Sequence, residues 1–349
     1  MRSLRSWISE HLGREDRDVP PPPRTGVLEE LRQGLPAPSD QTPPRLLMVA
    51  GKGGTGKTTV ACSLALGLMD RGVRVMVASI DPAHNLGDVL GTELGPEPSA
   101  VDPGRRLFAA EVDLEEAVRG YLERTHREVR HAYRYLQVLN LEKFLDTLRY
   151  APGVEEQATM EAVTGLLEAA HSEGCGVLLL DTPPTGLTLR VLALPTVSVR
   201  WAEGLQQVRQ EILKKREVIQ RATGPEEAVI GEEKVQLPAR ESDDEVSGIL
   251  KRYLEEASGL MHLFADPGRS GVVLVTHPDR LSVLESERML TELGRLGIPL
   301  ALVVWNRLEE EPKTLTGTSG HPVRRLPLLP SEPSDPETLR DLAGRILEG

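Results

Sequence analysis

The sequence of 349 residues contains little cysteine, few aromatic residues and no long apolar run. Its two cysteines, Cys62 and Cys175, cannot build a secreted disulfide framework or a four-cysteine zinc site within one chain. Aromatic residues make up only 3%, too few for a platform that stacks single-stranded nucleic acid. No apolar run approaches the roughly 20 residues of a membrane-spanning helix, and residues 1–16 lack the apolar core of a secretory signal. These absences favour a protein of the reducing cytoplasm.

The charge balance is acidic, because 53 Asp and Glu residues outnumber 41 Lys and Arg residues and give a formal net charge of -12. Such a balance argues against a broad surface for nucleic acid. Hydrophobic residues make up 39% and charged residues 27%, which is typical of a globular protein. The length allows one large α/β domain or two ordinary domains.

The first 44 residues are set apart by their many prolines. Proline at this density cannot continue a helix or join a central strand. We therefore predict a flexible, proline-rich extension over residues 1–44, with one or two helical turns near residues 27–31. Residues 1–12 are either a short amphipathic helix or a disordered tail, and the tail is favoured because short isolated helices are marginal.

Beyond residue 44, short apolar runs alternate with helical patterns. The runs lack polar alternation, as strands buried on both faces do. This order predicts an α/β fold, a doubly wound and mostly parallel sheet, within one domain over residues 45–349. The expected strands are residues 46–50, 73–80, 107–112, 177–180, 272–275 and 300–304, and an expected helix covers 57–69.

Two intervals, residues 114–172 and 196–264, are too long for simple crossovers between strands. Both carry apolar residues at helical spacing, so we expect them to form an inserted α-helical subdomain. Residues 223–247 are rich in Glu and Asp and contain two prolines. This composition predicts an exposed or disordered loop inside the second interval.

A glycine-rich segment follows the first expected strand. Residues 51–58 read GKGGTGKT and fit the pattern G-x-x-x-x-G-K-[ST] between a strand and a helix. Glycines let backbone N–H groups approach phosphate oxygens, and the helix N-terminus adds its positive dipole end. We expect Lys57 to neutralise the β and γ phosphates and Thr58 to offer its hydroxyl to Mg²⁺. The expected nucleotide-binding residues are Gly51, Lys52, Gly53, Gly54, Thr55, Gly56, Lys57, Thr58 and Thr59.

The expected strand 177–180 delivers Asp181 at its carboxyl end. Open α/β sheets bind their ligands at that edge. A carboxylate there, beside a phosphate loop, suits Mg²⁺. Asp181 is therefore the second candidate metal ligand, with Thr58.

An additional lysine, Lys52, gives the loop the form KGGTGKTT. This form resembles the deviant phosphate loop of a family that includes Min-type division proteins, nitrogenase iron protein and the arsenite-pump ATPases. In that family the early lysine reaches across a dimer interface to the partner's nucleotide. The resemblance therefore implies a homodimer and a catalytic role for Lys52 beside Lys57.

Two further segments narrow the resemblance. Residues 79–88, SIDPAHNLGD, and 181–190, DTPPTGLTLR, resemble switch I and switch II of the arsenite-pump ATPases and of their eukaryotic relatives that target tail-anchored membrane proteins. Residues 152–156, 281–288 and 327–330 also look like segments of that family. The resemblance runs from about residue 45 to the C-terminus.

The resemblance implies a cytoplasmic, Mg²⁺-dependent homodimer that hydrolyses ATP. It implies that Asp81 positions the attacking water or accepts its proton, and an Asp-Pro turn is compatible with that role. It also implies that Thr185 and Gly186 sense the γ-phosphate. The further nucleotide-binding residues would be Asn85, Asp181, Thr185, Gly186, Asn306 and Pro330.

The sequence also departs from the family pattern. Leu187 stands where switch II usually has His, so a hydrogen bond through that side chain is lost. Pro183 stands where Ala is usual. The eukaryotic relatives join their dimer with zinc through a Cys-x-x-Cys pair, which is missing here, so we expect no zinc site. Metalloid binding by clustered cysteines is not expected either.

Three biological roles stay open. The first is a homodimer that opens and closes with ATP to handle a protein client or partner, including a membrane-protein segment. With only 7 methionines, ordinary helix packing or a specific partner is favoured over a general apolar groove. The second is a Min/Par-like positioning ATPase that reaches a membrane through residues 1–12. The third is the ATPase subunit of an arsenite-efflux pump.

Overall fold

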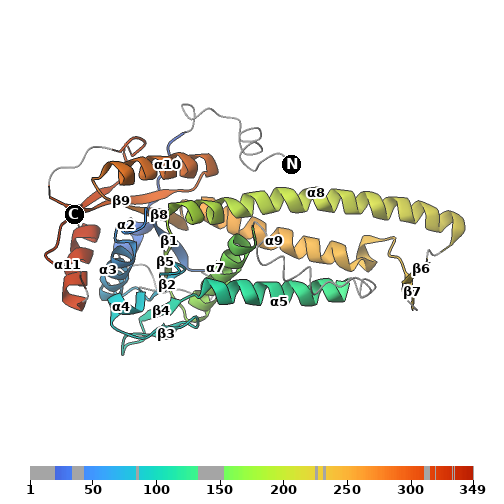
Figure 1. Cartoon of the computed structure of the whole chain (residues 1–349), viewed down its shortest axis with the longest axis horizontal. Helices are drawn as coiled ribbons and strands as arrows, with labels where there is room; N and C mark the ends of the chain where they lie inside the picture. The colour runs from blue at the N-terminus through green and yellow to red at the C-terminus, as the bar shows by residue number, and fades with distance from the viewer. Residues whose placement is uncertain are drawn as a thin grey trace. The chain divides into compact units, whose positions relative to one another are not determined.

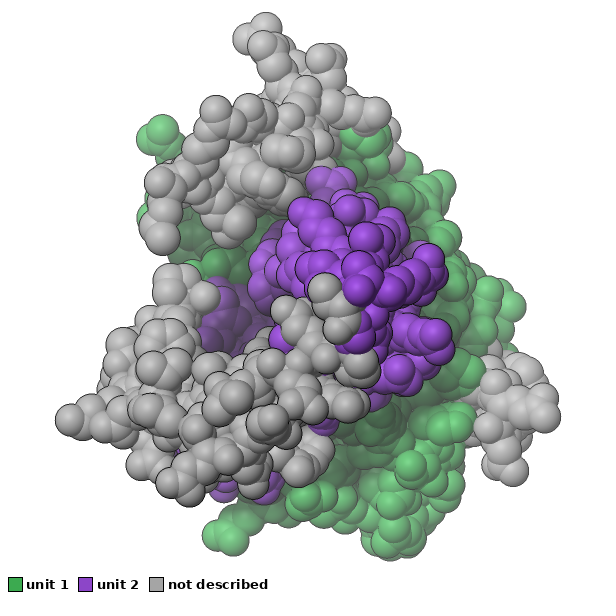
Figure 2. Space-filling view, turned by 90° about the vertical axis from the view of Figure 1, so that its right-hand side faces the viewer, with its two compact units in different colours: residues 1–114, 162–192, 263–349 green, residues 115–161, 193–262 purple. Residues whose placement is uncertain are grey.

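The chain forms two compact units, coloured separately in Figure 2. Unit 1 comprises residues 1–114, 162–192 and 263–349, and unit 2 comprises residues 115–161 and 193–262. No helix among the described residues is long and apolar enough to cross a membrane. The structure, a computed structural model, describes residues 20–33, 43–83, 86–132, 153–224, 227–230, 233–309, 315–318, 320–331, 333 and 335–348.

Unit 1 is built on an eight-stranded sheet of order β10-β9-β8-β1-β5-β2-β4-β3 (Figure 1). Every neighbouring pair is parallel except β3 with β4. This arrangement confirms the predicted α/β class with a doubly wound, mostly parallel sheet. The strands are β1 (Arg45–Ala50), β2 (Val75–Ser79), β3 (Ser99–Ala100), β4 (Leu107–Glu111), β5 (Val177–Asp181), β8 (Ser270–Thr276), β9 (Leu300–Leu308) and β10 (Val323–Pro327).

The six strands expected from apolar runs are all present, and two other strands of this sheet, β3 and β10, were not foreseen. β3 has only two residues and neither is buried. β10 reads VRRLP and lies at the edge of the sheet, where only one of its five residues is buried. Edge strands that carry charge leave no continuous apolar run for a sequence pattern to detect.

Five helices belong wholly to unit 1 in the described part of the chain. The phosphate-loop helix α3 is buried along most of its length, and α11 packs closely on it at Gly67, where an added Cβ would lie 2.7 Å from Cβ of Ala343. Asp279 caps the N-terminus of α10, and Gly297 ends it in the left-handed region with φ 69°. The helices are α2 (Val27–Arg32), α3 (Lys57–Asp70), α4 (Leu86–Leu90), α10 (Arg280–Leu296) and α11 (Pro336–Glu348).

The described part of the N-terminal segment is built into unit 1. Val27 and Leu31 on α2 are 0% exposed and join the main hydrophobic core. The backbone N–H of Leu300, at the start of β9, donates to the carbonyl of Pro23 at 2.8 Å. The expected helical turns near residues 27–31 thus exist, but residues 20–33 are anchored rather than loose, because two apolar side chains reach the core.

Unit 2 is mainly helical. It takes its helices from α5 (Leu114–Ala132), α7 (Val154–Ser172), α8 (Thr185–Thr223) and α9 (Glu245–Ala265). Between α8 and α9 lie an antiparallel hairpin, β6 (Glu227–Ile230) with β7 (Glu233–Gln236), and the short helix η3 (Glu241–Asp243). The hairpin and η3 correct the prediction of an exposed or disordered loop over residues 223–247, because part of this range forms regular structure. Val and Ile at several of its positions favour strands, and the acidic composition obscured that signal.

Two polar networks tie the helices of unit 2 together. Arg209 on α8 donates through Nε to Oδ2 of Asp244 at 2.8 Å and also contacts Oδ1 through Nη2. Asp244 precedes α9 and accepts from the backbone N–H of Ser247, so it caps that helix. The hydroxyl of Tyr253 lies 2.9 Å from Oγ of Ser198 and 3.3 Å from Oε1 of Gln157, which links α9 to α8 and α7.

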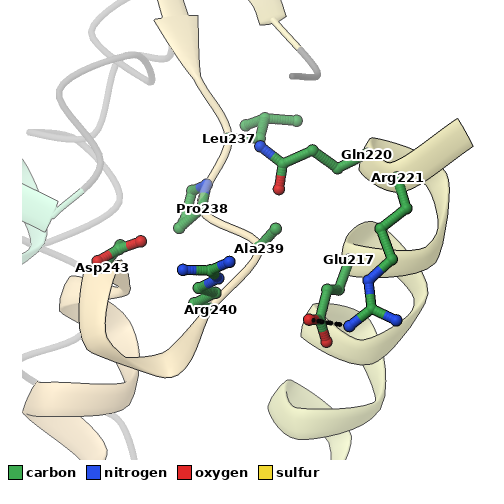
Figure 3. A pocket seen from close by; sticks show the side chains of 8 residues that line it. All are labelled: Glu217, Gln220, Arg221, Leu237, Pro238, Ala239, Arg240 and Asp243. Carbon is green, nitrogen blue, oxygen red and sulfur yellow. Dashed lines mark hydrogen bonds and ion pairs between the residues drawn. The ribbon is translucent and has the colours of Figure 1, made fainter. Parts of the chain in front are cut away.

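A pocket of about 620 Å³ lies within unit 2, between the C-terminal part of α8 and residues 237–243 (Figure 3). Its polar wall includes Glu217 and Arg221, which form an ion pair across one helical turn. None of the residues predicted to bind nucleotide lines it. The candidate site lies instead in unit 1.

Candidate functional site

The phosphate loop connects β1 to α3 in the backbone form that its glycines predict. Gly51 has φ 154°, and an added Cβ would lie 2.1 Å from the carbonyl oxygen of Val275 on β8. Gly56 has φ 87°, and its added Cβ would lie 2.4 Å from Nδ2 of Asn306. Both positions therefore exclude any side chain, for reasons of backbone conformation and of space.

Two side chains hold the loop in this shape. Thr55, which is 1% exposed, donates its hydroxyl to the carbonyl of Lys52 at 2.8 Å. Asn306 on β9 donates through Nδ2 to the carbonyl of Thr55 at 2.9 Å, and its Oδ1 accepts from the N–H of Arg307. Asn306 therefore meets the nucleotide loop as predicted, but its amide here supports the loop backbone. The expected contact of Asn306 with nucleotide stays a prediction.

Lys57 and Asp81 come together at the start of α3. Nζ of Lys57 lies 3.8 Å from Oδ2 of Asp81, and the side chains are 5% and 16% exposed. Oδ1 of Asp81 accepts from the N–H of Ala83 at 3.1 Å, which makes the turn expected of an Asp-Pro sequence. The carboxylate is thus held beside the lysine that the motif assigns to phosphate, where it could orient a nearby water.

Asp181 at the carboxyl end of β5 is buried and only partly bonded. Its Oδ2 accepts from Oγ1 of Thr58 at 2.7 Å and from Oγ of Ser79 at 3.5 Å. Its Oδ1 is buried and has no hydrogen-bond partner among the described residues. Burial raises the pKa of Asp181 to about 6, although the bond from Thr58 and the charge of Lys57 lower it.

These two residues fit Mg²⁺. A buried carboxylate oxygen without a partner is costly unless something binds it. Mg²⁺ prefers hard oxygen ligands, and the hydroxyl of Thr58 is hydrogen-bonded to Oδ2, the other oxygen of the same carboxylate. The sequence-predicted pair Thr58 and Asp181 therefore lies together in the structure with one oxygen left for a cation.

The switch II segment begins directly after Asp181. Thr185 opens α8, and its buried hydroxyl has no hydrogen-bond partner among the described residues. Thr188 donates to the carbonyl of Pro183 at 2.5 Å, which closes the turn before the helix. Gly186 is exposed, with nothing within 4 Å of an added Cβ, so no steric contact demands glycine there. Leu187 is half-buried.

The other predicted residues are placed as follows. Lys52 lies in the loop, with Nζ 3.7 Å from Oδ1 of Asp279. Gly53 and Gly54 are exposed in the loop, and Thr59 is half-buried on α3. Pro330 is exposed beyond β10. Asn85 lies outside the described residues.

Three neighbours of the site were missed by the sequence reasoning. Ser79 ends β2 and bonds Asp181, and Asp279 contacts Lys52. His277 follows β8, and burial and the charge of Arg307 hold its pKa below the usual value, although the backbone of Thr55 raises it. All three lie at or just beyond the carboxyl ends of sheet strands. The rule that ligands bind at that edge could have singled them out.

The sheet order, the loop that opens α3 and the carboxylate ending the neighbouring strand define a phosphate-loop nucleotide hydrolase. The chain belongs to the anion-transporting ATPase family (ArsA ATPases), whose family model matches residues 44–317. It is 32% identical to "ATPase get3" of Aspergillus terreus over 76% of this chain and 73% of the relative. It is 27% identical to "ATPase ASNA1 homolog" of Entamoeba histolytica over 75% and 76%. The protein is therefore an ATPase of this family.

Proposed function

We propose that this ATPase works in the cytoplasm as a Mg²⁺-dependent homodimer whose opening and closing handle a protein client with an apolar, membrane-protein segment. One observation carries the client half of this proposal: apolar residues on one face of α8 are exposed. The ATPase half rests on the family and on the convergence of Lys57, Asp81, Thr58 and Asp181 in unit 1.

The hydrolysis step needs little covalent chemistry from the protein. Phosphoryl transfer depends on in-line positioning and on neutralising phosphate charge. Lys57 supplies a buried cation to the phosphates, and Asp81, 3.8 Å away, orients the attacking water and takes its proton. Thr58 and Oδ1 of Asp181 would hold Mg²⁺, which supplies further positive charge at the phosphate oxygens.

The apolar row on α8 is the candidate client surface. Residues 201, 205, 208 and 212 follow one another at spacings of four, three and four, so they share a helical face. Trp201 is 60% exposed, Val208 59% and Ile212 38%, and Leu205 is half-buried. Large apolar side chains gathered on one face mark a contact site for protein or membrane segments. We call these four residues the α8 apolar row.

The cysteines argue against the arsenite-pump alternative. Cys62 and Cys175 are both buried and unpaired with each other. Burial raises the pKa of Cys175 to about 12 and that of Cys62 well above its usual value. Metalloid ligation needs thiolates, so neither cysteine suits that role. We therefore prefer the role in which the ATPase handles a protein client.

The test is the molar mass of Asp81→Asn protein measured by light scattering with Mg-ATP, with ADP and without nucleotide. Asp81→Asn should bind ATP without hydrolysing it at a useful rate, so the ATP state persists. We expect a dimer only with Mg-ATP. A monomer in all three conditions, or the same dimer in all three, contradicts nucleotide-gated association.

The client half is tested with the same protein and a fluorescent peptide that carries one apolar transmembrane-like segment. We expect binding by the Mg-ATP dimer and loss of that binding in Val208→Lys. Peptide binding that depends neither on the nucleotide nor on the α8 apolar row contradicts a client site on α8.

A further inference from the structure

The two lysines of the phosphate loop contact different carboxylates. Lys57 faces Asp81, whereas Lys52 faces Asp279, with 3.7 Å between Nζ and Oδ1. Lys57 is 5% exposed, but Lys52 is 29% exposed and Asp279 is 49% exposed. The outer pair is therefore open to water and can separate at small cost, whereas the inner pair is enclosed.

Asp279 is a fixed anion and not a mobile surface side chain. It caps α10: Oδ1 accepts from the N–H groups of Leu281 and Ser282 at 3.1 and 3.0 Å, and Oδ2 accepts from Oγ of Ser282 at 2.5 Å. These bonds and the charge of Lys52 hold the pKa of Asp279 below its usual range. Asp279 therefore stays ionised at neutral pH, at a point set by the first turn of α10.

We propose that Asp279 is a positioning residue that holds Lys52 within its own subunit and so opposes the nucleotide-dependent dimer. The inference rests on the proposed function, a nucleotide-dependent homodimer, and on the family resemblance, which implies that Lys52 reaches the phosphates of the partner subunit. One ammonium group cannot contact Asp279 and a distant phosphate together. Closure of the dimer therefore breaks the pair once in each subunit.

The size of the effect follows from the exposure of the pair. An exposed ion pair changes an equilibrium by up to about fivefold. A dimer releases two such pairs, so the dissociation constant should change by on the order of tenfold when the pair is removed. The effect should shrink at high salt, because exposed charges are screened.

Asp279→Asn removes the charge and keeps the cap, because Asn caps helices as well as Asp. The chain offers a matched control in Asp335→Asn. Asp335 caps α11 in the same way: Oδ1 accepts from the N–H of Thr338 at 2.8 Å, and Oδ2 from its hydroxyl at 2.7 Å. No lysine contact is recorded for Asp335 in the described part of unit 1. Any general effect of changing a capping Asp appears in both variants.

The measurement is the dimer dissociation constant by sedimentation with Mg²⁺ and a non-hydrolysable ATP analogue, at low and at high salt. We expect Asp279→Asn to lower it about tenfold at low salt, with Asp335→Asn unchanged and both variants melting near the wild type. Asp279→Ser, a second neutral cap, should match Asp279→Asn. In a Lys52→Ala background, Asp279→Asn should have no effect.

Three results overturn the proposal. One is an Asp279→Asn dimer no tighter than that of Asp335→Asn while the wild type dimerises normally. The second is an effect of Asp279→Asn that persists without Lys52. The third is a wild-type chain that stays monomeric with the analogue, which contradicts the proposed function itself. The first two leave the proposed function standing, so the two failures are distinguishable.

Discussion

Two buried aspartates, one in each unit, differ in how completely their carboxylate oxygens are hydrogen-bonded. In unit 1, Asp181 is 0% exposed, and its Oδ1 has no hydrogen-bond partner among the described residues. In unit 2, the side chain of Asp244 is 1% exposed, and both of its oxygens are bonded by Arg209, with Ser247 adding two more bonds. Burial raises the pKa of Asp181 to about 6, whereas the bonds to Asp244 outweigh its burial and lower its pKa.

The difference separates a carboxylate that joins helices from one that is available to a ligand. The hydrogen-bonding capacity of the Asp244 carboxylate is fully used within unit 2. The side chain can therefore stabilise α8 against α9, but neither oxygen is left for a ligand. Asp181 keeps one oxygen unbonded at the ligand edge of the sheet, at a cost to the stability of the chain. A buried charge with spare bonding capacity is therefore the stronger mark of function.

The same contrast appears in the apolar residues. In unit 1 the central strands β1, β2, β5 and β8 are buried at nearly every position. In unit 2, the α8 apolar row leaves Trp201 and Val208 more than half exposed. The central strands of the sheet bury their apolar side chains, whereas α8 leaves part of one apolar face exposed.

The largest expected effect is on turnover. Asp81→Asn should slow ATP hydrolysis by about 10²–10⁴-fold, because it removes the proposed base beside Lys57. Asp102→Asn is the control in unit 1: Asp102 accepts from the N–H groups of Gly104, Arg106 and Leu107, so it has a structural role only. Its kcat should stay within twofold of wild type. The measurement is steady-state ATPase kinetics of the two variants. Normal turnover by Asp81→Asn would show that Asp81 does not act on the attacking water.

The next effect is on folding and has opposite signs in the two units. Asp244→Asn should lower the free energy of unfolding of unit 2 by about 2–4 kcal/mol, because it removes the charge of a buried ion pair with Arg209. Asp181→Asn should raise that of unit 1 by roughly 1–3 kcal/mol at neutral pH, because it removes a buried ionised group.

Tryptophan fluorescence in urea can follow the two units separately. Trp305 on β9 is 3% exposed and reports on unit 1, whereas Trp201 reports on unit 2, so variants that keep only one of the three tryptophans, Trp201 or Trp305, resolve the transitions. Equal destabilisation by Asp181→Asn and Asp244→Asn would contradict the conclusion that one carboxylate stabilises its unit whereas the other destabilises its unit.

A third effect appears on acidification. The pKa of Asp244 is lower in the folded chain than its ordinary value of 3.8, so its ionisation stabilises folding above that value. This stability is lost as the pH falls below 3.8 toward the folded pKa. Asp244→Asn should therefore flatten the acid limb of the curve of unfolding free energy against pH for unit 2. An unchanged slope in urea titrations between pH 3 and 5 would show that Asp244 is not the responsible group.

The smallest expected effect on stability comes from the α8 apolar row. Val208→Lys and Val218→Lys should each change the free energy of unfolding by less than about 0.5 kcal/mol, since both residues are exposed. Val218 lies about 80° around the helix from Val208, outside the row, and serves as the control. Only Val208→Lys should weaken binding of an apolar peptide. Equal losses in the two variants would mean that the row has no special role.

The sequence predicted the parts of the fold that rest on local patterns. The six apolar runs became buried strands, and GKGGTGKT became the loop before α3. β10 was not predicted because it is a charged edge strand. The hairpin of β6 and β7 was not predicted because its Glu residues made the segment look like a polar loop despite its strand-forming residues. Burial of Val27 and Leu31 depends on a core assembled from distant segments, which no local pattern shows.

The site shows the same limit. Lys57, Thr58 and Asp181 could be assigned from motifs, and the structure brings them together. The contacts of Lys52 with Asp279 and of Asn306 with Thr55 join residues more than 200 positions apart in the chain. Such pairings depend on which strands become neighbours, and the order of strands in the sheet cannot be read from apolar periodicity alone.

The most direct test of the account is ATP turnover against Mg²⁺ concentration for the wild type, Asp181→Asn and Asp244→Asn, at a temperature where all three are folded. We expect the wild type and Asp244→Asn to saturate at the same Mg²⁺ concentration. Asp181→Asn should lose about 10²–10³-fold in turnover at every concentration. Two results would contradict the assignment of Oδ1 of Asp181 as a metal ligand. One is a turnover of Asp181→Asn that depends on Mg²⁺ as that of the wild type does, and the other is a loss of this dependence in Asp244→Asn alone.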